Sequence, residues 1–553
     1  MTNGQVTLHF LDFAIFILYM VGIIAFGFWV SRKGKNTAQG YFLGNKTIPW
    51  FVIGSSMVAA DISSEQFISY VGGAYKHGIV LAAGDWNAWV IYSLLILIFL
   101  PYYVRTGVTT MPEFLERRYN STCRYIFAIA SVIGFVAAIN AGALYSGGIM
   151  LDSFFGEGLA RLMPQLNISG KPVSPVVLYI VFFAVTTGVY TIYGGLKAAA
   201  WTDLLQMIIL LGAGFLVPVL ALRHVTDINA FIAANPEHFQ MFKPPTHKPF
   251  PFTGVFTGFL SVGIWYSCTS QHMVQRVLAA KDEWHARVGV VCAGFLHIIL
   301  PFFFIVPGII AFKMFPTLEH PDQAYLVLVK QFIPTGLKGL LLAGMAAALM
   351  GHVSTVVNSA STILTLDIYK KLINRNATEA QQVRFGRWSG AFVLVASIWI
   401  AISFTDTSTT LFEKINTVFF FIAPPFAVVF TVGILWKRAN AFAAVTTIVA
   451  GFIFTGALTQ FELLGRFNTF NHRALAAWIF CMLVMLIASL LTPPPPKEKT
   501  DGIIWNRSYL MLPPDEQARH RGLQDWRIWW ILFVVIVLCI YGFFIYWRIR
   551  NPW

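Results

Sequence analysis

Long apolar runs recur along the whole chain, and each is about as long as a membrane-spanning helix. A span needs roughly 20 consecutive apolar residues, and the sequence contains fourteen segments of this kind. Only 12% of the residues are charged, against about 25% in soluble domains, which excludes a soluble enzyme of this size. The sequence therefore predicts an all-α membrane protein. The fourteen expected spans cover residues 8–31, 48–73, 77–104, 123–154, 174–194, 200–222, 252–273, 286–315, 337–366, 385–405, 410–436, 439–462, 474–493 and 528–548.

The basic residues between these segments predict the orientation of the chain. If the amino terminus lies outside, clusters of Lys and Arg fall on one side, at residues 32–35, 117–118, 370–371, 384–387 and 437–438. Basic loops stay in the cytoplasm, so this side is the inner one. The net charge of +14 then reflects these loops and not a nucleic-acid partner. The expected division is membrane helices over 1–493, a polar, proline-led cytoplasmic linker over 494–527, and a last span with its tail over 528–553.

The sequence has no motif of a catalytic or metal site. The five cysteines lie far apart and form no CxxC pair, so neither a zinc site nor a disulfide framework is indicated. There is no HExxH motif and no phosphate-binding loop, and the one carboxylate pair at helical spacing, Asp61 and Glu65, has no His or Cys close by in the sequence. We therefore do not expect an enzyme, and we expect no organic cofactor.

Two of the expected spans are polar in their middle. One is the second segment, at residues 53–67, and the other is the seventh, at residues 263–272. Transporters built from inverted repeats have broken helices at matching positions in the two halves, and the solute binds between them. The five-segment spacing thus predicts a repeat core at about residues 48–436, with the polar residues facing a pathway. The alternative is that the carboxylates of the second segment lie in water at the outer end of their helix.

Seven sequence motifs lie in order between the second segment and the end of the eleventh. They cover residues 50–66, 86–87, 108–114, 193–197 with 201–206, 275–281, 358–362 with 367–369, and 436–438. With these motifs the chain resembles the sodium/solute symporters, and most closely the sodium/glucose cotransporter branch. The resemblance implies a leucine-transporter-type fold, which consists of two inverted five-helix repeats with added helices.

The resemblance also implies where a solute binds. In the family, polar residues of the broken second and seventh helices, and of the third, eighth and eleventh, hold a sugar. The residue types suit that chemistry, because carboxylates and amides bind hydroxyl groups and an aromatic ring packs on the apolar face of a sugar. The matching positions are Asp61, Glu65, Gln66, Asp85, Tyr266, His297 and Asn416.

Several of these positions depart from the glucose-transporting pattern. The family usually has Asn at position 61, Glu at 85, Lys at 297 and Gln at 416, and often a Trp where this chain has Ser267. We therefore expect a monosaccharide or a similar small polar solute, with glucose itself left open. His297 has a second interpretation, a buried imidazole that is satisfied by a backbone carbonyl.

The largest departure lies at the sodium site that the resemblance implies. The family uses two backbone carbonyls, here those of Ala59 and Ile62, and two adjacent serine hydroxyls, here at the positions of Gly351 and His352. A hard cation prefers oxygen ligands, which these two side chains do not offer. Sodium coupling would then need replacement ligands, for which the candidates are Asp203, Ser354 and Thr355. The alternatives are proton coupling through His352, or an uncoupled carrier in which a charged His352 takes the place of sodium.

These observations predict a secondary active symporter that imports a monosaccharide or a similar polar solute by alternating access. Sodium is the family's coupling ion, and a proton is the alternative. The expected partners are the solute, the coupling cation and the lipid bilayer. We expect a multi-pass protein of a bacterial inner membrane, because the segments between the spans are short. An uncoupled, channel-like uniporter stays open as a different class.

Overall fold

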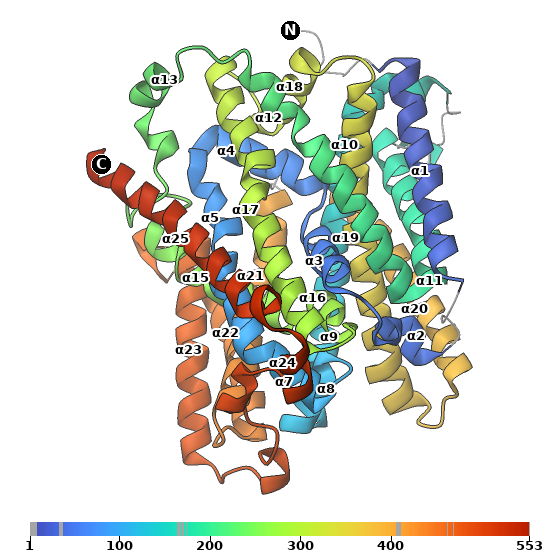
Figure 1. The fold of residues 1–553 in the computed structure, drawn as a ribbon, viewed down its shortest axis with the longest axis vertical. Coiled ribbons are helices and arrows are strands. Elements are labelled where there is room, and N and C mark those ends of the chain that lie inside the picture. Colours follow the sequence, from blue (N-terminus) through green and yellow to red (C-terminus); the bar gives the residue numbers. More distant parts are fainter. Residues whose placement is uncertain are drawn as a thin grey trace.

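The computed structural model describes residues 8–32, 37–162, 167–168, 171–172, 174–404, 411–461, 463–467 and 469–551. The description leaves out the side chains of residues 157–173, 411–417 and 466. Described residues form a bundle of long helices that stand side by side in Figure 1. Two short strands, β1 (Asn167–Ile168) and β2 (Lys171–Pro172), pair antiparallel at one end.

The helices account for most of the described chain. The α-helices are α1 (Phe10–Val30), α2 (Ala38–Leu43), α3 (Trp50–Asp61), α4 (Val71–His77), α5 (Ala83–Trp86), α6 (Ala88–Leu94), α7 (Leu100–Thr106), α8 (Met111–Arg118), α9 (Ser121–Gly134), α10 (Ala141–Leu162), α11 (Pro175–Gly214), α12 (Leu216–Leu222), α13 (Ile228–Ala234), α14 (Phe252–Val255), α15 (Gly258–Gly263), α16 (Gln271–Leu278), α17 (Glu283–Met314), α18 (Ala324–Phe332), α19 (Leu337–Ile363), α20 (Glu379–Ser403), α21 (Leu411–Leu435), α22 (Ala441–Gln460), α23 (Phe470–Leu491), α24 (Pro514–Arg519) and α25 (Trp526–Arg550). Five π-helical stretches are η2 (Gln66–Tyr70), η4 (Leu95–Phe99), η5 (Phe135–Asn140), η7 (Ile264–Thr269) and η9 (Leu364–Ile373). Short 3-10 turns are η1 (Gly44–Lys46), η3 (Gly78–Ala82), η6 (Pro236–Phe239), η8 (Pro321–Gln323), η11 (Gly465–Phe467), η12 (Lys497–Lys499), η13 (Arg507–Leu510) and η14 (Gly522–Gln524).

Eleven helical stretches of the described chain are long and apolar enough to cross a membrane. Two of them are 41 and 48 residues long, and at 1.5 Å per residue each exceeds the roughly 30 Å of the hydrocarbon core about twofold. The longer stretch bends at Gly195, where φ is 65° and an added Cβ would lie 2.5 Å from the carbonyl oxygen of Tyr41. Each therefore has the length for two crossings, while the count of fourteen spans stays a prediction.

Both helices that the sequence predicts to be interrupted are broken. Helix α3 ends at Asp61, Ile62 is extended, and helical structure resumes before η2. In the seventh segment, η7 ends at Thr269, Ser270 is extended, and α16 begins at Gln271. A π-helical stretch adjoins each break, and such stretches often mark functional sites.

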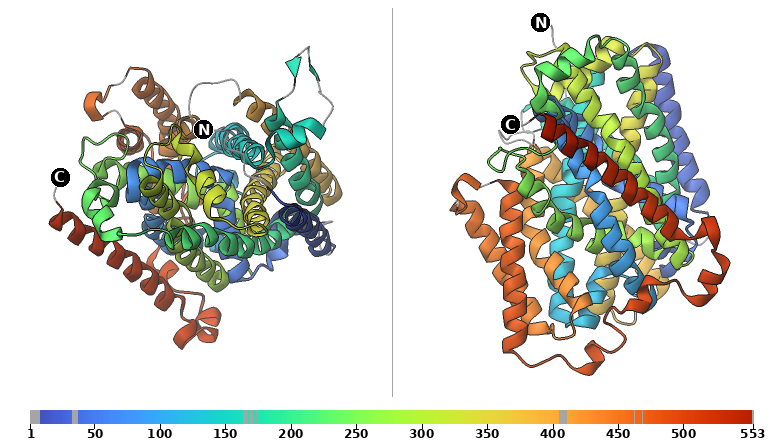
Figure 2. Two further views of the ribbon diagram at one scale, coloured as in Figure 1. Left: turned by 90° about the horizontal axis from the view of Figure 1, so that it is seen from above. Right: turned by 60° about the vertical axis from the view of Figure 1, so that its left-hand side comes forward.

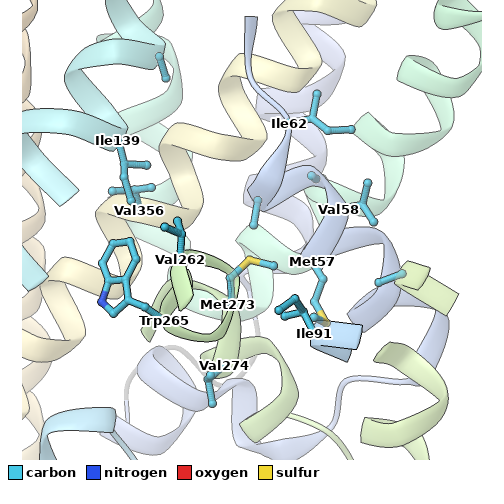
Figure 3. Close-up of a cluster of buried hydrophobic side chains, with 14 of the residues drawn as sticks. Met57, Val58, Ile62, Ile91, Ile139, Val262, Trp265, Met273, Val274 and Val356 are labelled. Carbon is cyan, nitrogen blue, oxygen red and sulfur yellow. The ribbon is translucent and has the colours of Figure 1, made fainter. Parts of the chain in front are cut away.

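The centre of the bundle is a hydrophobic core around these breaks. Figure 3 shows Met57 and Val58 of α3 lying near Met273 of α16, with Trp265 of η7 and Val356 of α19 on the other side. All five side chains are buried. Helix α19 is buried almost throughout and packs on α11, so it is the central helix of the bundle. The breaks are therefore fixed by tight apolar packing on either side.

The outer helices show how the chain surrounds this core. Helices α1 and α11 flank one side and α22 and α23 the other, while α25 crosses the surface at an angle (Figures 1 and 2). Helix α25 packs against α17 and α6. Helix α8, which carries Arg117 and Arg118, lies at the lower end in Figure 1, far from the amino terminus. This end is the one that the positive loops predict to be cytoplasmic, and the orientation stays a prediction.

Residues 494–527, which the sequence predicts to be a linker, pack against the helix ends on the side of α8. The indole nitrogen of Trp505 donates to the Leu97 carbonyl and its backbone N–H to the Ile434 carbonyl, each at 3.0 Å. Lys499 donates to the Glu116 carbonyl at 2.8 Å. We call residues 494–527 the strap. The division of the chain at this segment stays a prediction, but the strap itself is a folded part of this face.

A buried ion cluster joins the strap to the start of α17. Both oxygens of the Glu283 carboxylate accept from Arg105, at 2.8 and 3.0 Å, and Oε1 also accepts from Arg287, at 2.5 and 3.1 Å. The two guanidinium groups also donate to strap carbonyls, among them those of Ser508 and Tyr509. Glu283 and Arg287 are at most 1% exposed. This cluster is the main electrostatic attachment of the strap.

We expect Glu283→Gln to lower the melting temperature of the detergent-purified protein strongly. Removing one partner of a buried pair costs about 3–5 kcal/mol, because the remaining charge stays buried without compensation. The matched control is Asp515→Asn, which removes a carboxylate whose ion pair with Arg519 is more than half exposed on both sides, and such pairs contribute little. Equal melting temperatures for the two variants would contradict this account of the strap.

Candidate solute and ion sites

A cavity of about 180 Å³ lies where the two broken helices meet. Cavities of about 150 Å³ hold a benzene ring, so this one has room for a single six-membered ring. The polar lining comes from the break after α3, from η2, α5, α6, η7 and α17, and from His352 of α19. Of the seven predicted solute-binding residues, six line it: Asp61, Glu65, Gln66, Asp85, Tyr266 and His297. The seventh, Asn416, lies outside the residues whose side chains are described.

His297 lies between two carboxylates in this cavity. Its Nδ1 is 3.1 Å from Oδ1 of Asp85, and its Nε2 is 3.4 Å from Oδ2 of Asp61. The hydroxyl of Tyr92 lies 2.9 Å from the same Nε2. The imidazole is therefore held by side chains of three other elements, and the interpretation in which a backbone carbonyl satisfies it is wrong.

Gln66 spans the break of the α3 segment. Its side-chain oxygen accepts from the backbone N–H of Ser63 at 2.7 Å, and its nitrogen donates to the carbonyl of Asp61 at 2.9 Å. The amide thus replaces hydrogen bonds that a continuous helix would make. Gln66 lines the cavity, but both ends of its amide already have backbone partners.

Aromatic rings form much of the remaining wall. Tyr70, Tyr92, Tyr266 and Phe419 line the cavity, and the ring of Tyr266 lies 5.8 Å from that of Phe419. The sequence analysis identified only Tyr266 among them. A signal was present for Tyr92, which lies seven residues, or two helical turns, after Asp85 and so on the same face.

The residues of the implied sodium site also lie together. A Cβ added at Gly351 would lie 3.4 Å from the Ala59 carbonyl oxygen and 3.0 Å from Oε1 of Gln206. A hydroxyl at this position would therefore face the carbonyl that the family is expected to use. His352, the next residue, lines the solute cavity and lies beside the carbonyls of Ala60 and Ile139. An imidazole thus lies between the solute cavity and the ion site.

The replacement ligands proposed for sodium already have partners in the protein. Arg276 donates to Oγ1 of Thr355 at 2.5 Å and lies 3.8 Å from Oδ2 of Asp203. The same Asp203 oxygen accepts from Ser56 at 2.5 Å. Ser354 donates to the Gly351 carbonyl at 3.0 Å. The buried Oδ1 of Asp203 has no hydrogen-bond partner among the described residues, so one carboxylate oxygen is free here.

Comparison with known proteins decides the family. A model of the sodium:solute symporter family matches residues 41–451. The chain belongs to the sodium:solute symporter family. It is 31% identical to the sodium/glucose cotransporter of Vibrio parahaemolyticus over 523 residues, which cover 89% of this chain and 92% of the relative. It is 30% identical to the human sodium/myo-inositol cotransporter, over 91% of this chain and 76% of the relative.

Solved structures show the same fold for this symporter. A Na⁺-coupled sialic acid symporter in a substrate-bound, outward-open state superposes with a TM-score of 0.77 at 22% identity, covering 88% of this chain and 99% of that one. Mhp1, a nucleobase-cation-symport-1 transporter, superposes with a TM-score of 0.53 at 13% identity, covering 87% of this chain and 100% of that one. The protein is thus an all-α, multi-pass membrane symporter of the leucine-transporter type, and not an enzyme.

Proposed function

We propose that this symporter carries a small polyhydroxylated solute, of the size of a monosaccharide or a cyclitol, in the cavity between its two broken helices. The observation that carries the proposal is the convergence of three carboxylates, two imidazoles and five aromatic rings on a cavity that fits one ring. Hydroxyl groups donate to carboxylates, and aromatic faces pack on the C–H groups of a sugar. The names of its relatives, a glucose and a myo-inositol cotransporter, support the same class.

An anionic sugar is the second candidate, because the structural neighbour is a sialic acid symporter. A carboxylate ligand is usually held by Arg or Lys. Neither residue type lines the cavity in the part of the chain whose side chains are described, and three carboxylates do. The cavity therefore favours a solute without negative charge.

We propose further that sodium is not obligatory for transport. The family is sodium-coupled, but here glycine and histidine stand where two hydroxyl ligands are expected. Thr355 is engaged by Arg276, and His352 lies beside the solute cavity. Histidine is the side chain whose charge changes nearest to neutral pH. His352 is therefore the group whose protonation would couple transport to a proton gradient.

The deciding experiment measures uptake of a labelled hexose and of labelled myo-inositol into proteoliposomes. A sodium gradient, a proton gradient and no gradient are applied in turn to the wild-type protein. We expect saturable uptake that persists without sodium. Protein-free liposomes give the leak. Uptake at the leak rate for both solutes would overturn the proposed substrate class, and strict dependence on sodium with indifference to pH would overturn the proposal for the coupling ion.

Tyr266 gives a separate prediction. Its ring lines the cavity from η7 and its hydroxyl lies within hydrogen-bonding reach of Asp61. We expect Tyr266→Ala to weaken solute binding about tenfold or more, since both a stacking face and a polar contact are lost, and Tyr266→Phe to weaken it less. Isothermal titration of the purified protein with the solute measures the difference. Wild-type affinity in Tyr266→Ala would show that the ring only packs the helix.

A further inference from the structure

The hydrogen-bonding groups of the cavity are unevenly available to a solute. The side-chain amide of Gln66 binds backbone groups at the helix break. Asn87, which also lines the cavity, donates to the Val255 carbonyl at 3.2 Å and accepts from Tyr541 at 2.8 Å. Both amides of the described lining are therefore already used within the protein. The remaining hydroxyls, such as those of Tyr70 and Ser267, can both donate and accept, whereas the three carboxylates of the lining can only accept when ionised.

Two carboxylates of the lining have oxygens without a partner. The Asp85 side chain is only 11% exposed, and its buried Oδ2 makes no hydrogen bond among the described residues. The carboxylate of Glu65 has no hydrogen-bond or ion-pair partner in the described part of the chain, and it faces the cavity. A buried charge without a partner is costly, so a partner from the solute would be favoured here.

The charge of the cavity also favours a solute that donates hydrogen bonds to carboxylates. Asp61, Glu65 and Asp85 line the cavity, and neither Lys nor Arg does among the residues whose side chains are described. The lining has two imidazoles. That of His297 lies between Asp61 and Asp85, and neither imidazole forms an ion pair with Glu65 among the described residues. The three carboxylates therefore outnumber the two imidazoles that could balance their charge.

We propose that the solute carries an ammonium group on its polyhydroxylated ring, as an amino sugar does, and that Glu65 binds this group. The proposal rests on the proposed function and names the solute class of that same cavity. An ammonium has three donors and no acceptor, which matches the surplus of free acceptors. Hydrogen bonds between ammonium and carboxylate are stronger than neutral ones, and the rings of Tyr70 and Tyr266 offer electron-rich faces to a cation.

The test compares four ring probes of similar size in the proteoliposome assay at neutral pH. These are glucosamine, which carries the ammonium, glucose, the neutral N-acetylglucosamine, and the anion glucuronate. We expect glucosamine to be taken up with about tenfold higher kcat/KM than glucose, and N-acetylation to abolish this preference. Equal values for glucosamine and glucose would overturn the inference and leave the proposed function standing. Uptake of none of the four would overturn both.

A variant pair locates the preference at Glu65. Glu65→Gln lowers uptake of both sugars, but we expect the ratio of glucosamine to glucose to fall to about one. The control is Glu319→Gln, which removes an exposed carboxylate outside the cavity and should leave the ratio unchanged. A preference that survives Glu65→Gln, or one that Glu319→Gln removes equally, would contradict the assignment to Glu65.

Discussion

We expect solute uptake to fall at least 100-fold when His297 is replaced by Ala, with the protein still reaching the membrane. The imidazole separates the carboxylates of Asp61 and Asp85, which otherwise face each other without compensation. Breaking a buried ion pair costs about 3–5 kcal/mol, and each 1.4 kcal/mol is tenfold in affinity. Uptake of the solute into proteoliposomes, normalised to the amount of reconstituted protein, measures the loss.

A compensated variant distinguishes charge balance from general damage. The double variant Asp61→Asn, His297→Lys introduces the amide and the permanent charge that the resemblance implies for glucose transporters, and we expect it to recover much of the lost activity. His285→Ala is the control, because His285 contacts Asp282 at 2.8 Å outside the cavity. If His297→Ala transports like the wild type, or if the double variant transports no better than His297→Ala, the proposed role of this imidazole is wrong.

The second large effect concerns the coupling ion. Gly351→Ser together with His352→Ser places one hydroxyl beside the Ala59 carbonyl and a second at the next residue. A Cβ at position 351 fits there once Oε1 of Gln206 moves by a few tenths of an ångström. We expect this double variant to gain sodium stimulation of at least tenfold, because oxygen ligands suit a hard cation. Uptake is measured in sodium-free and sodium-containing buffers across a pH series.

The matched control for this variant is Gly351→Ala with His352→Ala. It makes the same steric changes but supplies no hydroxyl, and we expect no sodium stimulation. Sodium stimulation in both double variants would mean that removal of the imidazole, and not the new ligands, is responsible. A wild-type protein that already needs sodium would show that Asp203, with its free Oδ1, completes a working site.

The sequence was sufficient to predict the two helix breaks and six of the residues that line the cavity. Polar residues in an apolar membrane segment are costly unless they face a pathway. The polar residues at 53–67 and 263–272 therefore identified these two segments as candidates for broken helices. The partners of those residues were not predictable. Gln66 binds the backbone at its own break, which depends on local geometry that spacing does not reveal.

Aromatic residues of apolar helices were harder still to assign. Phe419 lies in a run of three phenylalanines, which is more typical of lipid contact or packing than of a binding face. The structure places it in the cavity wall beside Tyr266. The contacts of Arg276 were equally hard to predict. Its guanidinium donates to Thr355 and lies near Asp203, and the sequence motif that contains Arg276 does not reveal either partner. Such assignments depend on which helices are neighbours, and only the fold decides that.

The strap has a mechanical consequence for alternating access. It bonds to the Leu97 and Ile434 carbonyls, which belong to η4 and α21, and through the Glu283 cluster it is attached to the start of α17. Any movement that separates these helices on this side has to stretch or release the strap. Each hydrogen bond that breaks adds about 0.5–1.5 kcal/mol, so the strap acts as a tether that sets how far, and how often, this end of the protein opens.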